Sequence, residues 1–165
     1  MASSVLATFS PVVALCSVNE FLFIARGHVI SVYLSGKLQC RSAVLGSEPI
    51  SRIKFRDISN SKIRLYASAG RRLFELSYHE SNLLYHHLLS SADLILDFVL
   101  FHTYIVIGNA HNFIQVYSLD SSLIQTVLSS DLLALYSMKL LLFNDELFVL
   151  SGSHRSGGVG VESSF

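Results

Sequence analysis

The chain contains no tryptophan, and only two cysteines and two prolines among its 165 residues. Cys16 and Cys40 do not form a CxxC pair, which argues against a metal site or a disulfide framework. The simpler interpretation is that both are small buried hydrophobic residues in a reducing compartment.

Charge is also scarce. Only 15% of the residues are charged, and 12 Lys and Arg balance 12 Asp and Glu, whereas about a quarter of an ordinary protein is charged. This balance gives no support for nucleic-acid binding through a broad basic field, so only a local patch remains. In contrast, 51% of the residues are hydrophobic, which indicates a folded domain with a substantial core.

The apolar stretch at 5–18 lacks the features of an export signal or a membrane span. No Lys or Arg precedes Arg26, so the positive region of a signal peptide is missing. Pro11 interrupts the run and Asn19 ends it, well short of the roughly 20 apolar residues that a span requires. We therefore expect a buried strand here and a cytoplasmic protein without membrane association.

Short apolar runs alternate with polar turns along the whole chain. The clearest example is 103–119, where apolar runs at 104–107 and 113–117 flank Gly108 and a polar turn at 109–112. Two β-rich runs around a Gly/Asn turn predict a hairpin. Arg56 to Ser61 is expected to be a polar turn. We predict strands at 11–18, 21–25, 28–34, 37–45, 50–55, 62–68, 71–78, 83–89, 94–100, 103–107, 111–119, 123–128, 132–143 and 146–150.

These runs repeat with a regular period. Gly27, Gly70, Gly108 and Gly152 each follow an apolar run, at spacings of 43, 38 and 44 residues. A period of about 40–45 residues with four strands per unit is typical of β-propeller blades. We predict an all-β fold in residues 1–152, a partial WD40-type β-propeller of about three and a half four-stranded blades. Residues 153–165 are predicted to be a flexible tail outside the propeller, without a strand pair.

Three segments resemble a known family: Pro11–Tyr33, Tyr66–Leu76 and Asp93–Tyr117. They are similar to the opening blades of the WD-repeat protein 6 family, large WD-repeat proteins that partner a tRNA 2′-O-ribose methyltransferase. The resemblance spans roughly 11–152. The chain departs from the pattern because Tyr33-Leu34 and Tyr117-Ser118 stand where a Trp-Asp dipeptide would be. Full-length members are far longer, so the chain resembles an N-terminal fragment.

The resemblance implies a non-catalytic scaffold. In that family the WD-repeat subunit binds the methyltransferase and helps to present tRNA for 2′-O-methylation of the wobble nucleotide of the anticodon. The implied partners are the catalytic subunit of the tRNA 2′-O-methyltransferase and tRNA, with no cofactor and no small-molecule ligand. The alternative function is a generic WD-repeat interaction module in membrane traffic or signalling.

No catalytic or metal-binding motif stands out. There is no HExxH, no Cys/His pair at ligand spacing and no GxSxG, and adjacent His86 and His87 should face opposite sides of a strand. Asp97 lies in an apolar run, and a buried carboxylate can mark a catalytic group, but the simpler role of an aspartate in such blades is to bond a neighbouring His or Ser. The Gly-rich segment at 152–160 lacks the Lys-Ser/Thr dipeptide that ends a phosphate-binding loop. Structural roles in loops, blade edges and tight turns are expected for the other histidines and aspartates: His28, His79, His102, His111, His154, Asp93, Asp120, Asp131 and Asp145.

The one local concentration of basic residues lies in the second repeat. Arg56, Arg64, Arg71 and Arg72 are candidate contacts with RNA or a partner. If they share one rim, with Lys62 among them, they could meet tRNA phosphates. The alternative is an ordinary solvated turn.

Overall fold

The computed structural model describes residues 11–43, 48–59, 62–101, 103–128, 135–144, 146–153 and 159–162. Within these ranges, fifteen strands form four antiparallel sheets. In the first three sheets, four consecutive strands pair in sequence order, and the fourth sheet has three strands. We call these sheets blades 1 to 4.

Blade 1 consists of β1 (Val12–Val18), β2 (Phe21–Arg26), β3 (Val29–Leu34) and β4 (Lys37–Ala43). Blade 2 consists of β5 (Ile50–Ser59), β6 (Lys62–Ala69), β7 (Arg72–His79) and β8 (Asn82–Ser90). Blade 3 consists of β9 (Ile95–Phe101), β10 (Tyr104–Asn109), β11 (Phe113–Ser118) and β12 (Leu123–Leu128). Blade 4 consists of β13 (Leu135–Phe143), β14 (Glu146–Ser153) and β15 (Val159–Glu162).

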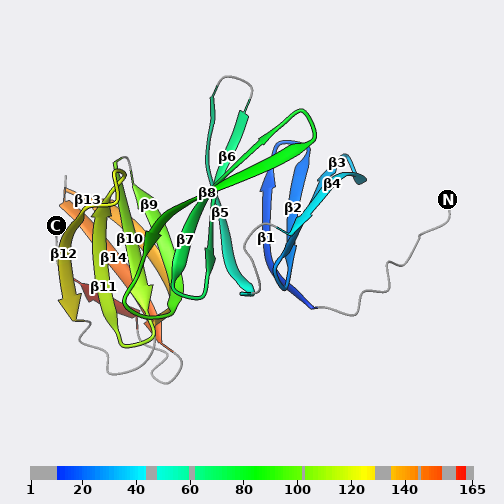
Figure 1. The fold of residues 1–165 in the computed structure, drawn as a ribbon. Helices are drawn as coiled ribbons and strands as arrows, with labels where there is room; N and C mark the ends of the chain where they lie inside the picture. The colour runs from blue at the N-terminus through cyan, green and yellow to red at the C-terminus, as the bar shows by residue number, and fades with distance from the viewer. Residues whose placement is uncertain are drawn as a thin grey trace.

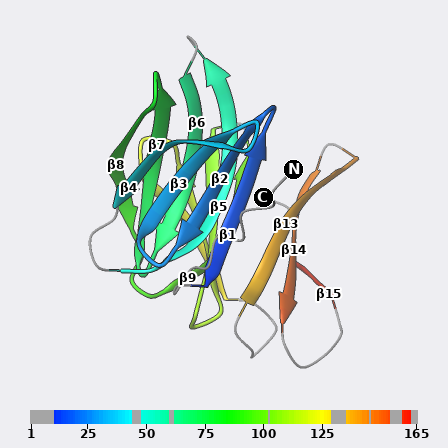
Figure 2. The same ribbon diagram turned by 90° about the vertical axis from the view of Figure 1, so that its right-hand side faces the viewer.

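The blades follow one another as in a propeller (Figure 1). The first strands of successive blades lie next to one another: β1 contacts β5, β5 contacts β9, and β9 contacts β13. On the outer side, β4 contacts β8. Figure 2 shows β13 and β14 standing apart from β1, so the four blades form an open arc. The predicted all-β, partial β-propeller fold is confirmed.

Two-residue turns join most neighbouring strands. Both central residues have positive φ at Ser35-Gly36 (46° and 81°) and at Glu80-Ser81 (49° and 63°), which is the type I′ geometry that matches the twist of a hairpin. Gly70 has a φ of 57°. A Cβ at this position would also lie 2.4 Å from the Glu48 carboxylate, which would have to shift; the backbone conformation is therefore the main reason for glycine here.

Three apolar clusters lie between the blades. The cluster between blades 1 and 2 includes Phe23, Leu65 and Tyr78, and Tyr78 meets Phe23 edge-on with ring centroids 5.8 Å apart. Tyr66, Phe98 and other residues form the cluster between blades 2 and 3. Met138 and Val149 belong to the cluster between blades 3 and 4. Such burial is the main favourable term in folding, so stacking of the blades supplies the core.

A repeated backbone bond connects successive blades. The Ile50 N–H donates to the Gly27 carbonyl at 2.8 Å, and the Ile95 N–H donates to the Gly70 carbonyl at 2.9 Å. In each pair the first strand of one blade is bonded to the second turn of the preceding blade. The glycine repeat therefore marks equivalent positions in blades 1 and 2, but Gly108 and Gly152 lie within strands, paired with Ile114 and Val159.

Three expectations about the strands are wrong. The strand expected to be buried at 5–18 is mostly exposed over its described part, Val12–Val18, where Leu15 is 58% exposed, because no further blade covers that side of β1 among the described residues. Arg56 to Ser61 is not a polar turn over its described part, because β5 continues to Ser59. This extension is held by the Asp57–Arg64 pair across β5 and β6. The tail after Gly152 does build strand pairing, since Val159–Glu162 forms β15 beside β14; the apolar residues at 159 and 161 suit a short strand. The domain boundary at 152 itself stays a prediction.

In the part of the chain that the structure describes, no helix is long and apolar enough to cross a membrane.

Candidate functional site

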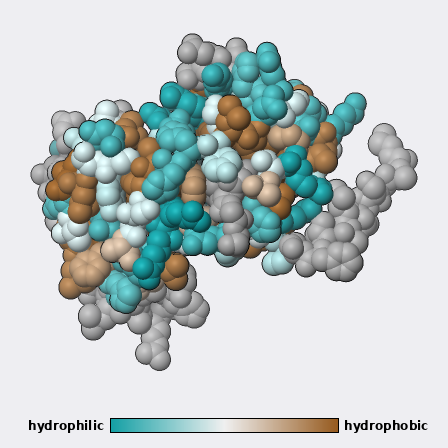
Figure 3. All heavy atoms as spheres, viewed as in Figure 1, coloured by the Kyte–Doolittle hydropathy of each residue, from teal (hydrophilic) through white to brown (hydrophobic). Residues whose placement is uncertain are grey.

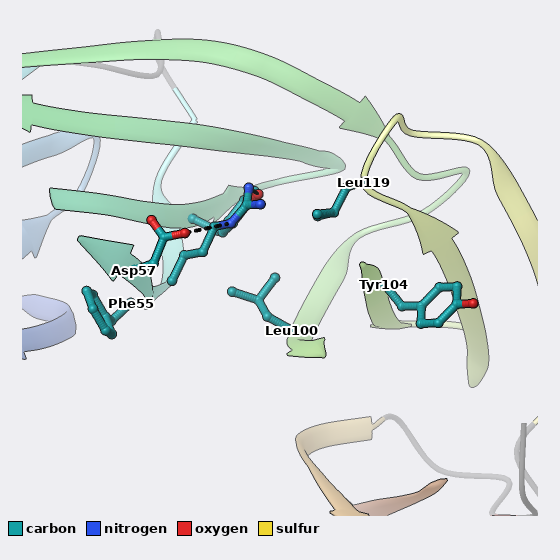
Figure 4. A pocket seen from close by; sticks show the side chains of 7 residues that line it. Phe55, Asp57, Leu100, Tyr104 and Leu119 are labelled. Atoms are coloured by element: carbon teal, nitrogen blue, oxygen red, sulfur yellow. Dashed lines mark hydrogen bonds and ion pairs between the residues drawn. The ribbon is translucent and has the colours of Figure 1, made fainter. Parts of the chain in front are cut away.

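A cleft of about 290 Å³ opens between blades 2 and 3, at the end of the blades where β5 meets β6. It is lined by Phe55, Arg56, Asp57, Tyr66, Leu100, Tyr104 and Leu119. Figure 4 shows Phe55 and Asp57 at one end, Tyr104 at the other, and Leu100 and Leu119 between them. Phe55 and Tyr104 are 42% and 41% exposed, so the cleft offers accessible aromatic surface.

Charged side chains form one wall of this cleft. Arg64 donates two hydrogen bonds of 2.7 Å to the two oxygens of Asp57, and Arg56 Nε lies 3.6 Å from the same carboxylate. Arg56 also donates to the Tyr66 hydroxyl and lies over the Tyr66 ring, 5.4 Å from its centroid. Burial raises the pKa of Tyr66, and the nearby positive charge of Arg56 lowers it by a smaller amount. Two arginines thus share one carboxylate, which leaves a net positive charge beside the cleft.

Arg71 and Arg72 lie at the other end of blade 2. Ala69 pairs with Arg72 across the β6–β7 turn, whereas Arg64 pairs with Ser77 near the start of β6. With a rise of about 3.3 Å per residue, the extended stretch from Arg64 to the end of β6 at Ala69 spans roughly 16 Å. The four arginines therefore do not share one rim, because β6 separates them into two pairs. Whether either pair contacts RNA or a partner stays a prediction.

The surroundings of the second pair differ from those of the first. Arg72 lies 3.3 Å from the Glu48 carboxylate and stacks over Phe74 at 5.3 Å. Arg71 is exposed and lines a second cavity of about 300 Å³, with Asp93 and His111 among its walls. Among the described residues, no ion pair joins Arg71 to a carboxylate.

Asp93 and His111 form a bonded pair beside this second cavity. Asp93 precedes β9 and His111 lies in the β10–β11 turn, as the bonded Asp–His interpretation of the sequence expects. Burial raises the pKa of Asp93, but the Leu94 N–H and His111 outweigh it, so the pKa is lowered. The pair joins the entry of blade 3 to the turn that follows its second strand, which is a structural role.

Asp97 is the most deeply placed charge of the inner strands, only 4% exposed. Lys54 of β5 lies 2.7 Å from its carboxylate, and the Met138 N–H of β13 donates to it at 2.7 Å. The Phe98 N–H donates at 2.9 Å. The carboxylate therefore links three blades. The expectation that Asp97 is buried and has partners is confirmed. These partners are enough to explain why a charged side chain is buried here, so the burial needs no catalytic role.

Other candidates from the sequence do not converge on a site. His86 pairs with Glu75 and His87 with Phe74 on the adjoining strand, and the His87 ring meets the Phe74 ring at 5.7 Å. Burial raises the pKa of Cys16. No group of three His, Cys, Asp or Glu that could hold a metal occurs among the described residues. Four candidates lie outside the described residues: His102, Asp131, Asp145 and His154.

Known structures show what the arc of blades is similar to. No family model matches the chain, and no curated protein sequence matches it. The computationally designed Ika4 protein superposes with a TM-score of 0.72 at 18% identity, over 99% of both chains. The WD40 β-propeller domain of Doa1 superposes with a TM-score of 0.63 at 12% identity, over 92% of this chain and 53% of its own. This chain has a WD-repeat-like propeller fold.

A third similar structure is a complex. BBS1N, solved in complex with ARL6DN, superposes with a TM-score of 0.70 at 10% identity. The match covers 99% of this chain and 55% of BBS1N. The chain thus spans about half the length of the BBS1N and Doa1 chains.

Sequence reasoning missed the charged contacts of β5. Arg52, Lys54 and Arg56 alternate along this strand, and the first two approach Asp97 at 3.7 and 2.7 Å. The sequence does contain a pattern that could have predicted these contacts: cations alternate along a strand that the propeller repeat places near the axis. The Asp57–Arg64 pair was missed because the sequence predicted a turn at Asp57.

Proposed function

We propose that this chain is a non-catalytic propeller scaffold that binds a protein partner through the cleft between blades 2 and 3. The observation that carries this is the composition of the cleft: exposed Phe55 and Tyr104 lie beside Arg56, with the Asp57–Arg64 ion pair next to it. Aromatic residues and arginine are enriched in protein–protein interfaces. Because Arg56 and Arg64 are already paired with Asp57, they suit a protein surface better than a phosphate backbone.

The partner we propose is the catalytic subunit of a tRNA 2′-O-ribose methyltransferase. The support is the resemblance of three segments to the WD-repeat protein 6 family, together with the propeller fold. The chain would hold the enzyme and help to present tRNA, while supplying no catalytic group itself.

Binding to the cleft can be tested with matched variants. Tyr104→Glu places a charge in the cleft, whereas Tyr85→Glu changes a tyrosine on the outer strand β8 that is 52% exposed. If the catalytic subunit binds here, Tyr104→Glu weakens its affinity by about tenfold or more, and Tyr85→Glu leaves it unchanged. Calorimetry with the purified catalytic subunit measures both. Failure of the unmodified chain to bind would remove this partner from consideration.

The tRNA contact is proposed for the other end of blade 2, at Arg71 and Arg72. Charge reversal of both should lower the affinity of the chain–methyltransferase complex for tRNA and flatten its dependence on salt. A control that reverses Lys37 and Arg41 on β4 changes the net charge equally and should have a much smaller effect. If the Arg71/Arg72 variant binds tRNA as the parent does at every salt concentration, these arginines contact no phosphate.

A second candidate is a generic interaction module in membrane traffic or signalling. The observation that favours it is that BBS1N, a structure of similar fold, was solved in complex with ARL6DN. Binding of a different protein partner that Tyr104→Glu abolishes, without binding of the methyltransferase subunit, would favour this candidate.

A further inference from the structure

The two end blades bury one face where the middle blades bury two. In blades 2 and 3, neighbouring residues that point to opposite faces are equally buried: Leu65 and Tyr66 are 0% and 1% exposed, and Ile105 and Val106 are 0% and 1%. This continuous burial is expected when a sheet is covered on both sides.

Blade 1 instead shows alternation. In β2, Phe23 and Ala25 are fully buried against blade 2, while Leu22 and Ile24 between them are only partly buried. In β1, Leu15 is 58% exposed. Leu15 pairs with Ile24 on the face that points away from blade 2. Ser31 and Tyr33 of β3 are buried on this face, so its exposed apolar surface is that of β1 and of Leu38 in β4.

Blade 4 shows the same alternation at the other end of the arc. Met138 is 2% exposed and packs against blade 3, whereas Lys139 and Leu141 are exposed and Leu141 reaches 46%. Leu141 pairs with Phe148, and Lys139 pairs with Leu150, both of which are partly buried. The outward face of blade 4 is therefore also largely apolar.

These two faces are the two halves of a contact that the chain already makes three times. Between each pair of successive blades, the face that follows one blade packs on the face that precedes the next. Among the described residues, no strand packs on the preceding face of blade 1 or on the following face of blade 4. The open face of blade 1 is the type of face on which blade 4 would pack, and the reverse also holds. Figure 2 shows that the two blades lie apart within one chain.

We propose that these faces are the interface between two copies of this chain, with blade 4 of each copy stacked on blade 1 of the other. A two-fold arrangement makes the contact twice and closes the ring, which removes both open faces. The chain spans about half the length of the BBS1N and Doa1 chains, so two copies supply about as much chain as one of those. The formal net charge of zero means that the copies do not repel one another at long range. On the side seen in Figure 3, polar and apolar side chains are interspersed.

The test is the molar mass of the purified full chain, measured by light scattering during size exclusion across a dilution series. A closed dimer has twice the 18.3 kDa of one chain. A monomer at all concentrations overturns the proposal, and so do assemblies that grow beyond a dimer, because a head-to-tail contact that fails to close gives filaments.

Variants locate the contact. Leu15→Glu and Leu141→Glu each place a carboxylate in both interfaces of the dimer, and each should raise the dissociation constant by about 100-fold or more. Leu84→Glu, on β8 and 67% exposed, makes the same change on the outer side and should leave the dimer intact. Far-UV circular dichroism confirms that each variant is folded. A dimer that survives both end-blade changes, or that Leu84→Glu dissociates, uses another surface and refutes the proposal.

Discussion

Asp97→Ala should loosen blade 4 from blade 3. The Asp97 carboxylate accepts hydrogen bonds from the Met138 N–H at 2.7 Å and the Phe98 N–H at 2.9 Å, and pairs with Lys54 at 2.7 Å. Alanine removes all three contacts at once. Met138 is 2% exposed, so water cannot readily replace the lost acceptor.

The two contacts that cross between blades, with Met138 and Lys54, set the magnitude. A buried N–H without an acceptor costs about 1–3 kcal/mol. The lost ion pair adds about 1 kcal/mol rather than the larger value of a fully buried pair, because the Lys54 side chain is 28% exposed and regains water. We expect Asp97→Ala to lower the free energy of unfolding by about 2–4 kcal/mol. For a chain of this size that lowers Tm by about 5–15 °C. Asp97→Asn keeps an oxygen for Met138 and should lose about half as much.

Two measurements check this. The chain has no tryptophan, so unfolding in urea is followed by far-UV circular dichroism, and hydrogen exchange reports on the Met138 amide. Asp120→Ala is the control, because Asp120 is exposed and its bonds to described residues lie within its own turn. If Asp97→Ala unfolds as the Asp120 variant does, or if protection of Met138 is unchanged, Asp97 does not anchor blade 4.

Three further predictions concern a turn, an acid and a thiol. Gly70→Ala and Gly27→Ala both replace a glycine at φ +57°, but only a Cβ at 70 meets the Glu48 carboxylate; both should lose about 1–2 kcal/mol of unfolding free energy in urea, with a further loss of about 1 kcal/mol at 70. Equal losses would mean that Glu48 simply moves aside. The pKa of Asp93 is lowered, so its stabilising effect is complete above about pH 4 and lost as the pH falls further. Asp93→Asn should therefore make the urea midpoint less sensitive to pH below about 4, and an unchanged pH profile would contradict this. Burial raises the pKa of Cys16, so mass spectrometry should find it alkylated more slowly than a free thiol at neutral pH, with the rate restored in urea; equal rates would show an exposed thiol.

Local patterns in the sequence were enough to predict most strands and the propeller. Apolar runs, polar turns and a repeat near 43 residues are short-range properties, and hairpins depend mainly on short-range properties. The positions of Gly27 and Gly70 follow from turn geometry that few other residues adopt. The sequence also indicated a buried Asp97, because a charge in an apolar run needs a partner.

Contacts between blades could not be predicted in this way. Lys54 and Met138 reach Asp97 from positions more than 40 residues away on either side, and no local pattern sets which inner residues meet once the blades stack. The extension of β5 through Asp57 was missed for the same reason, since a polar run becomes a strand only when Arg64 lies opposite to pair with it.

The sequence by itself determined the repeat, the strand order and the two-residue turns, because these depend on side-chain periodicity and backbone conformation over a few residues. The tertiary structure alone decided that Arg56 and Arg64 meet at the Asp57 carboxylate, at one end of blade 2. The physical reason is that the polar residues at the end of β5 form a strand only where β6 lies opposite to pair with them. The same stacking of blades left one apolar face open at each end of the arc.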